Sequence, residues 1–302
     1  MTRKLGSILI ATLALAACQS IAPAAPQAKL NVVAAETFLA DIAQNVAGDR
    51  VPIAALMPIG VDPHGFEPTP IDVAKVADSN LLIINGAGFE GFLAELLQNA
   101  GGQRTIIEAA AGLASRQPSR TEIVADTIDP HFWLDPNHVI KYAENIRDGL
   151  SQADPDGAAI YAANADRYIQ QLQALDQTIR DQVAAIPAAR RLIVTNHESF
   201  GYFADRYGFK IIGTIVPSVS AGSAPSAQQL AQLIDHIKAT GASAIFLETG
   251  TNPQLAQQVA NETGLKVVTG LYSHSITDAS GPAPTYLDMM RANVTAIVAA
   301  LK

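Results

Sequence analysis

The chain has 302 residues, of which 49% are hydrophobic and 16% are charged, and its formal net charge at pH 7 is −8. A chain of this length exceeds one typical hydrophobic core, so two domains are expected. The charges are scattered and predominantly acidic, which argues against a nucleic-acid partner. The single cysteine allows no disulfide within one chain, so the fold must depend on the burial of apolar side chains.

The first 17 residues have the pattern of a lipoprotein signal peptide. Arg3 and Lys4 give a positive start, and residues 5–17 form an apolar stretch too short to span a bilayer. Small residues end this stretch directly before Cys18, and this ending resembles the lipobox of bacterial lipoproteins. We therefore expect an exported protein that is anchored through lipid on Cys18 and faces the periplasm or the cell exterior.

An N-terminal lobe is expected over residues 30–150, after an Ala/Pro-rich stretch at 18–29 that is typical of a flexible tether. Short apolar runs alternate there with amphipathic segments. Near-continuous apolar runs indicate strands that are buried on both faces of a parallel sheet. The expected strands are 30–35, 51–57, 81–85 and 105–108, and the expected helices are 37–46, 70–77 and 89–99.

One long helix is predicted from about residue 157 to 185, within a connecting segment at 151–188. Its apolar residues recur at steps of three and four, which gives one apolar stripe. Asp154 or Asp156 is a candidate for the cap at its start. Such a helix would be about 40 Å long, enough to connect two lobes rigidly.

The C-terminal lobe, residues 189–302, repeats the alternation of the first. Its expected strands are 192–195, 210–216, 244–247 and 266–272, and its expected helices are 200–207, 226–240, 253–263 and 284–301. The pattern predicts an α/β protein of two similar lobes, each with a core of its own and a mainly parallel sheet, joined by the long helix. A binding site is expected in the cleft between them.

Four of the six histidines occur in positions suited to a metal site. His64 and His131 each follow an Asp-Pro pair, and proline stiffens the corner from which the imidazole leaves. His197 and His274 follow predicted strands, and open α/β sheets bind their ligands at the carboxyl ends of strands. Four neutral imidazoles satisfy the tetrahedral coordination of zinc.

The other two histidines are not expected to bind metal. His236 lies on an amphipathic helix and is expected at the surface, and His138 lies at a helix start, where a structural role is favoured.

The sequence resembles the metal-specific solute-binding lipoproteins of ABC importers, which bind zinc or manganese between two lobes joined by one rigid helix. The resemblance covers nearly all of residues 30–302. Four segments match in order and spacing: Asp-Pro-His-Gly-Phe-Glu-Pro at 62–68, Pro-His-Phe-Trp-Leu-Asp-Pro at 130–136, Asn-His-Glu-Ser-Phe-Gly-Tyr-Phe at 196–203 and Pro-Thr-Tyr-Leu-Asp-Met-Met at 284–290. The resemblance implies a binding protein rather than an enzyme, with an ABC permease and its ATPase subunit as partners. We expect a monomer.

The resemblance implies that His64, His131 and His197 are metal ligands, but it leaves the fourth ligand open. The family usually has aspartate where this chain has His274. His274 is preferred because its place in the motif is unshifted. Asp278 is the alternative, and a third possibility is a water molecule that completes a three-histidine site.

The types of donor favour Zn²⁺, with Mn²⁺ or iron as the alternative, because imidazole suits zinc and carboxylate suits manganese. Histidines that bind metal usually donate their second ring N–H to a carboxylate or carbonyl group. The candidates for such partners are Glu67, Asp135, Glu198 and Glu248.

Two other functions are compatible with parts of the sequence. The adjacent His197 and Glu198 would suit an exported zinc hydrolase, but the sequence has no His-Glu-x-x-His motif, and a fourth histidine would fill the open position that catalysis needs. A surface adhesin with an incidental metal is the other alternative.

Overall fold

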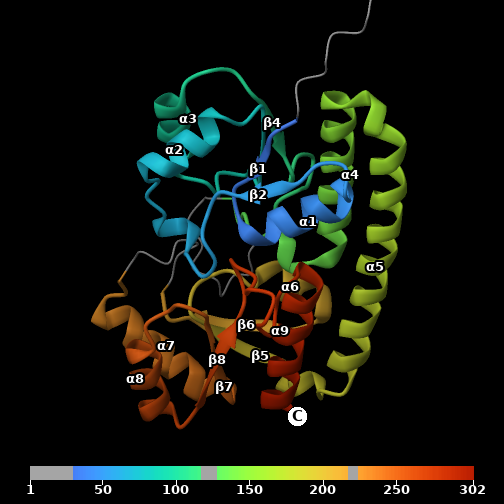
Figure 1. Cartoon of the computed structure of the whole chain (residues 1–302). Coiled ribbons are helices and arrows are strands. Elements are labelled where there is room, and N and C mark those ends of the chain that lie inside the picture. Colours follow the sequence, from blue (N-terminus) through green and yellow to red (C-terminus); the bar gives the residue numbers. More distant parts are fainter. Residues whose placement is uncertain (1–29, 117–127, 217–223) are drawn as a thin grey trace, which may run out of the picture.

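The computed structural model describes residues 30–116, 128–216 and 224–302 (Figure 1). The N-terminal lobe contains four parallel strands in the order β2-β1-β3-β4. Val32 of β1 is paired with both Ile53 of β2 and Leu81 of β3. The strands are β1 (Val32–Ala34), β2 (Ile53–Ala55), β3 (Leu81–Ile84) and β4 (Thr105–Glu108).

Helices cover both faces of this sheet. Val33 and Leu82 point to the face packed by α2 (Pro70–Ala77) and α3 (Leu93–Ala100). Their neighbours Val32 and Leu81 belong to the core on the opposite face, where α1 (Thr37–Ala47) and α4 (Pro136–Ala153) pack. Burial on both faces explains why the central strands are apolar without alternation.

The C-terminal lobe repeats this topology. Its four parallel strands are in the order β6-β5-β7-β8, which is the order of the first sheet displaced by four strands. The strands are β5 (Leu192–Thr195), β6 (Lys210–Thr214), β7 (Ala244–Glu248) and β8 (Lys266–Leu271), and the helices are α6 (Gly201–Tyr207), α7 (Ala227–Thr240), α8 (Gln254–Thr263) and α9 (Tyr286–Leu301). The predicted fold class, two α/β lobes with parallel sheets and a long helix, is confirmed.

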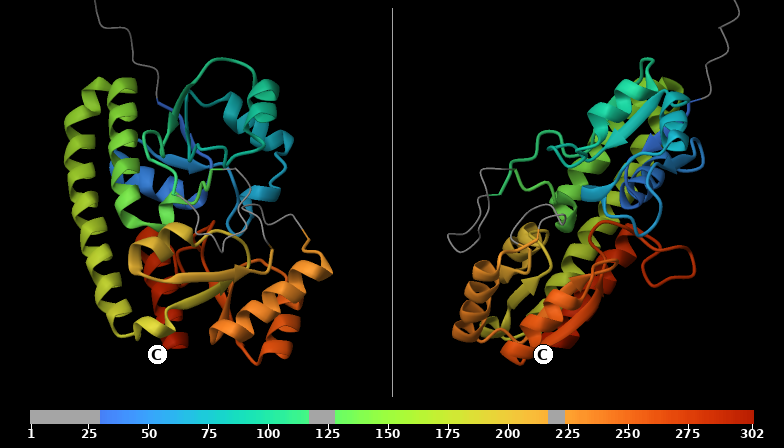
Figure 2. Two further views of the ribbon diagram at one scale, coloured as in Figure 1. Left: turned by 180° about the vertical axis from the view of Figure 1, so that it is seen from behind. Right: turned by 90° about the vertical axis from the view of Figure 1, so that its left-hand side faces the viewer.

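The long helix α5 (Ala158–Ala184) runs along both lobes, as Figures 1 and 2 show from three sides. Its predicted cap was wrong, because the N-cap position is Gly157 and no side chain caps the helix. Asp154 instead accepts hydrogen bonds from Arg50 and from the Tyr161 hydroxyl, and Asp156 lies in a short 3-10 turn before the helix. Asp154, which was expected to cap α5, therefore forms an ion pair with Arg50 instead.

Among the described residues, no helix combines the length and the apolar character needed to cross a membrane.

The largest hydrophobic core is shared by the two lobes, although separate cores were expected. It contains Trp133 from the N-terminal half, Tyr168 from α5, and Phe203 and Met290 from the C-terminal half. The helix α9 returns to the N-terminal lobe, where the backbone N–H of Tyr286 donates to Asp41 on α1. Among the described residues, each sheet also has a smaller core on its other face, built from residues of one lobe.

Candidate metal centre

The two Asp-Pro-His segments form corners of the same kind. The Asp62 carboxylate accepts the backbone N–H of His64 at 2.9 Å, and the Asp129 carboxylate accepts that of His131 at 3.0 Å. An aspartate that binds the backbone two residues later makes a local turn, and the intervening proline fixes its own φ angle. Both imidazoles therefore leave the chain from stiff corners of the N-terminal lobe.

The other two histidines follow strands of the C-terminal lobe. His197 comes two residues after β5, and its carbonyl accepts the Thr195 hydroxyl at 2.8 Å. His274 comes three residues after β8, next to Ser273, whose carbonyl accepts the indole N–H of Trp133 at 2.6 Å. Both positions lie beyond the carboxyl ends of their strands, where open parallel sheets bind ligands.

The structure brings the four histidines together between the lobes. One ring nitrogen from each lies within 4.8 Å of the others, and the ring centroids are 5.0–5.5 Å apart. The Nε2 atoms of His64 and His131 are 3.4 Å apart. Zinc–nitrogen bonds of 2.0–2.1 Å in a tetrahedron place neighbouring nitrogens about 3.4 Å apart. The spacing of this first pair therefore equals one edge of a zinc tetrahedron.

Carboxylates lie beside the outer nitrogens of three rings. Nδ1 of His131 lies 2.8 Å from Asp129, and Nδ1 of His197 lies 2.9 Å from Glu248. The second oxygen of Glu248 is 3.5 Å from Nδ1 of His274. The Nε2 atoms of His197 and His274 are buried and have no hydrogen-bond partner among the described residues. Buried polar atoms without partners are rare, and here a cation would satisfy both.

Glu248 is itself fixed by two serines. The hydroxyl groups of Ser199 and Ser273 donate to its two carboxylate oxygens at 2.9 and 2.5 Å. These bonds hold the carboxylate between the two histidines of the C-terminal lobe.

The electrostatic environment keeps three of the rings neutral. Burial lowers the pKa of His64 to about 3, and the nearby His131 and His197 rings add to this shift. Burial also lowers the pKa of His131 and of His274 well below the ordinary value. Neutral imidazoles offer a free lone pair, so these three rings are ready to bind a metal at pH 7.

His197 differs from the other three rings. Burial by itself would lower the pKa of His197, but the Glu248 carboxylate beside it raises this pKa. Burial would likewise raise the pKa of Glu248, but the charge of His197 outweighs it and holds this pKa below its ordinary value. Burial raises the pKa of Asp129 to about 7. Among the ring partners, Glu248 is therefore the fixed negative charge beside the histidine cluster.

The proposed alternative ligand lies elsewhere. Asp278 is exposed, and its carboxylate accepts the backbone N–H and the hydroxyl of Ser280. It is not part of the group of converging residues. His236 is exposed on α7, and His138 packs its ring edge-on against Phe132 and Tyr202 near the start of α4.

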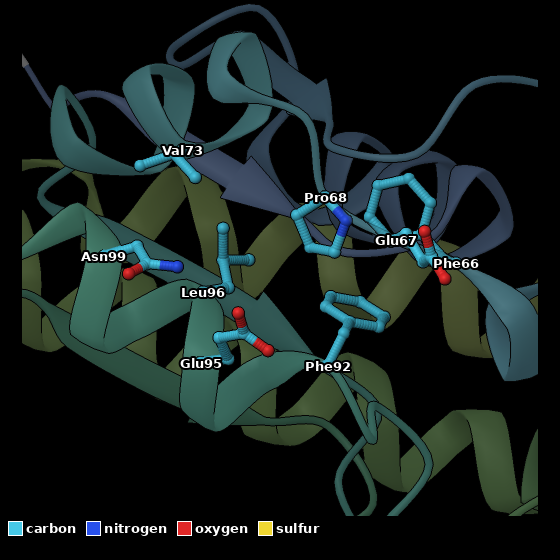
Figure 3. A pocket seen from close by; sticks show the side chains of 8 residues that line it. All are labelled: Phe66, Glu67, Pro68, Val73, Phe92, Glu95, Leu96 and Asn99. Carbon is cyan, nitrogen blue, oxygen red and sulfur yellow. The ribbon is translucent and has the colours of Figure 1, made fainter.

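The four candidate carboxylates also separate. Glu248 lies beside the histidines, but Glu67 is exposed and lines a separate hollow of about 430 Å³ together with residues of α2 and α3 (Figure 3). Asp135 caps α4 by accepting the N–H of Asn137, so its carboxylate serves the helix. Glu198 is half-buried in the turn that follows β5. Neither Glu67 nor Asp135 therefore has the position that was expected of it.

Three further residues support the rings and were not expected from the sequence. Asp129 contacts His131, and Ser199 and Ser273 bind Glu248. Asp129 had a visible signal, because it is the aspartate of the second Asp-Pro-His corner. The two serines had none, since their role depends on Glu248, which lies far from both in sequence.

Two lobes joined by a long helix, with a cluster of one half-buried and three buried histidines between them, define a metal-binding protein. The family described as zinc-uptake complex component A, periplasmic (ZnuA), matches residues 32–300. The chain belongs to this family of metal-binding lipoproteins of ABC importers and is the substrate-binding component of such an importer. Its family is thus one of transport proteins, not enzymes.

Named relatives differ in their metals. The manganese-binding lipoprotein MntA of Halalkalibacterium halodurans is 35% identical over 90% of this chain and 88% of its own length. The iron-binding protein YfeA of Yersinia pestis is 32% identical over 96% of this chain and 91% of its own length. The solved structure of the periplasmic zinc-binding protein TroA of Treponema pallidum has a TM-score of 0.82 and 28% identity, and covers 91% of this chain and 99% of its own.

Proposed function

We propose that this protein captures one Zn²⁺ ion with His64, His131, His197 and His274 and delivers it to the permease of its importer. The observation that carries this proposal is the convergence of four ring nitrogens within 4.8 Å, two of them buried without partners. Four nitrogen donors suit a tetrahedral zinc ion, and a site without a carboxylate ligand disfavours manganese.

Manganese or iron is the second candidate, because the relatives MntA and YfeA are named for binding them. Both metals favour oxygen donors more than zinc does. The donor set of this chain therefore argues for zinc, and the names of the relatives argue for manganese or iron.

Metal analysis of the protein purified from its native envelope, with competition titrations of Zn²⁺, Mn²⁺, Fe²⁺ and Cu²⁺, tests the proposal. We expect one zinc per chain and binding of Zn²⁺ at least 100-fold tighter than that of Mn²⁺, in line with the order of affinities for nitrogen sites. Copper serves as the upper reference, since it binds such sites more tightly than zinc. Native protein loaded with manganese, together with tighter Mn²⁺ binding, would contradict the proposal.

Alanine substitutions test the ligand set. His64→Ala, His131→Ala, His197→Ala and His274→Ala should each weaken zinc binding by two or more orders of magnitude, and the exposed His236→Ala should leave it unchanged. An effect of His236→Ala equal to that of His197→Ala would show that the assignment is wrong.

We further propose that Cys18 is the mature N-terminus and carries the lipid that anchors the protein. Cys18 and the signal segment lie outside the described residues, so this proposal depends on the sequence pattern. The lipoprotein names of relatives such as MntA support it. Cys18→Ser should release the protein from the membrane fraction while zinc binding stays intact. A free thiol on the native protein would refute it.

A further inference from the structure

The segment that carries His274 is bound on both sides by the opposite lobe. On one side, the indole N–H of Trp133 donates to the carbonyl of Ser273 at 2.6 Å. On the other side, the backbone N–H of Gly60 donates to the Ser275 hydroxyl at 2.8 Å, and the Thr37 hydroxyl lies 3.1 Å from it. His274 follows a strand of the C-terminal lobe, but N-terminal residues fix the backbone around it.

The hydrogen bonds around Ser275 allow one arrangement of protons. The Ser275 hydroxyl donates to the carbonyl of Ile276 at 2.8 Å and accepts from Gly60. The Thr37 hydroxyl accepts the backbone N–H of Ile276 at 3.1 Å, so its own proton is free to go to Ser275. Each hydroxyl then uses its single proton once. Both side chains are buried, at 6% exposure for Thr37 and 5% for Ser275, so each bond lost leaves a polar group without water.

We propose that Thr37, Ser275 and the N–H of Gly60, here called the hydroxyl node, position His274 as a ligand and set the lifetime of the bound metal. The inference rests on the proposed metal capture. The node joins residues from opposite lobes, so it exists only while the lobes keep their present arrangement. A displacement of one lobe from the other would break the node and separate the metal from the ligands of the N-terminal lobe together.

Within the C-terminal lobe, the side-chain amide of Asn293 bonds the backbone N–H and C=O of Tyr272, two residues before His274. Ser273 and Glu248 lie 3.0 and 3.5 Å from Nδ1 of His274, and they control how its ring rotates. The distance of the ring from the other three histidines depends on the backbone of the segment. Metal coordination tolerates errors of about 0.2 Å in a bond length, so a small displacement of this backbone removes a ligand.

Matched substitutions test the node in the full-length protein. Thr37→Val keeps the shape and removes the hydroxyl, Thr37→Ser keeps the hydroxyl, and Ser275→Ala removes the partner. Ser280→Ala is the control, because Ser280 lies in the same loop, is exposed, and donates to Asp278. Stopped-flow mixing of the Zn²⁺-loaded protein with excess chelator measures the release rate, and thermal unfolding without metal reports any general loss of stability.

We expect Thr37→Val and Ser275→Ala to release zinc roughly tenfold faster, which corresponds to the loss of one buried hydrogen bond. The effects of the two substitutions should be less than additive in the double variant, since both remove the bond between Thr37 and Ser275. Thr37→Ser and Ser280→Ala should behave like the unchanged protein. With Co²⁺ as a spectroscopic probe, the first two variants should lose the intense visible absorption of a four-coordinate site.

Unchanged release rates in both hydroxyl-free variants would overturn the inference, as would full additivity in the double variant. If Ser275→Ala does not fold, the comparison of Thr37→Val with Thr37→Ser still decides the question. Failure of the proposed function has a different signature. In that case the unchanged protein does not retain zinc, or His197→Ala retains it equally well.

Discussion

At the scale of single residues, Glu248 is the most consequential side chain that is not itself a proposed ligand. Its two oxygens face the outer nitrogens of His197 and His274, and its charge persists because its pKa is held low. Glu248→Gln keeps the size but removes the charge, and we expect zinc affinity to fall 10- to 100-fold. The matched control is Glu67→Gln, which changes an exposed glutamate on a different hollow. Equal affinities of both variants in a competition titration would contradict this role.

The type of residue at position 274 also affects how much of the positive charge of the bound ion is neutralised by its ligands. An aspartate in its place would supply an anionic oxygen, which manganese prefers. We therefore expect His274→Asp to reduce the preference for Zn²⁺ over Mn²⁺ by at least tenfold, measured by competition between the two ions. His236→Asp adds the same charge on the exposed face of α7 and should leave the preference unchanged. A preference that does not move in His274→Asp would exclude a ligand role for this residue.

At the scale of secondary structure, the contact between α1 and α9 makes stability depend on pH. Asp41 on α1 accepts the N–H of Tyr286, and burial raises the pKa of Asp41 to about 6. In the unfolded chain this carboxyl ionises near pH 4, so the folded state loses stability as the pH rises from 4 to 6 and keeps that penalty above pH 6.

We therefore expect Asp41→Asn to stabilise the protein by about 1 kcal/mol at pH 8 and to have little effect at pH 4. The amide oxygen of asparagine still accepts the N–H of Tyr286. Urea unfolding at both pH values measures this difference, and Asp49→Asn, at an exposed position in the loop that follows α1, is the control. If Asp41→Asn destabilises the protein equally at both pH values, ionisation of Asp41 does not lower the free energy of unfolding.

Sequence periodicity predicted the elements well and their ends less well. The apolar runs located all eight described strands. Burial on both faces gives an uninterrupted signal in β1, β3 and β7, whereas β2, β4 and β8 are apolar although partly exposed. The third helix was expected from residue 89 but begins at Leu93. The Glu90 carboxylate accepts the backbone N–H groups of Asn85 and Gly86 and folds these residues into a turn. A carboxylate used in this way leaves no periodic signal.

The histidines could likewise be predicted from local sequence patterns, whereas their hydrogen-bond partners depend on contacts between residues distant in sequence. Asp-Pro-His corners and strand ends are local patterns, and they indicated the four histidines that the structure brings together. The partners of these rings depend on which strands lie side by side. Glu248 lies beside His197 and His274 because β5, β7 and β8 are neighbours in the sheet. Glu67 and Asp135 are close to histidines in sequence, but Glu67 lines a separate hollow and Asp135 caps α4.

At the scale of the whole molecule, the shared core should make the two lobes unfold together. Leu172 of α5 is fully buried in this core. Leu172→Ala should cost about 2–5 kcal/mol of unfolding free energy. Hydrogen exchange of the amides in β3 and β5 measures the effect in each lobe, and we expect protection to fall by the same amount in both sheets. The exposed Leu255→Ala is the control. Loss of protection in one sheet alone would show that the lobes unfold separately.

The position of α9 has a consequence for how the protein is made. The last helix closes the shared core by packing against α1, α5 and β8, so the N-terminal half cannot complete its core until the end of the chain is available. A nascent chain that lacks Tyr286–Leu301 leaves apolar surface of α1 and α5 open to solvent. A polypeptide threaded through a secretion channel in an unfolded state would complete this shared core only after α9 had emerged from the channel.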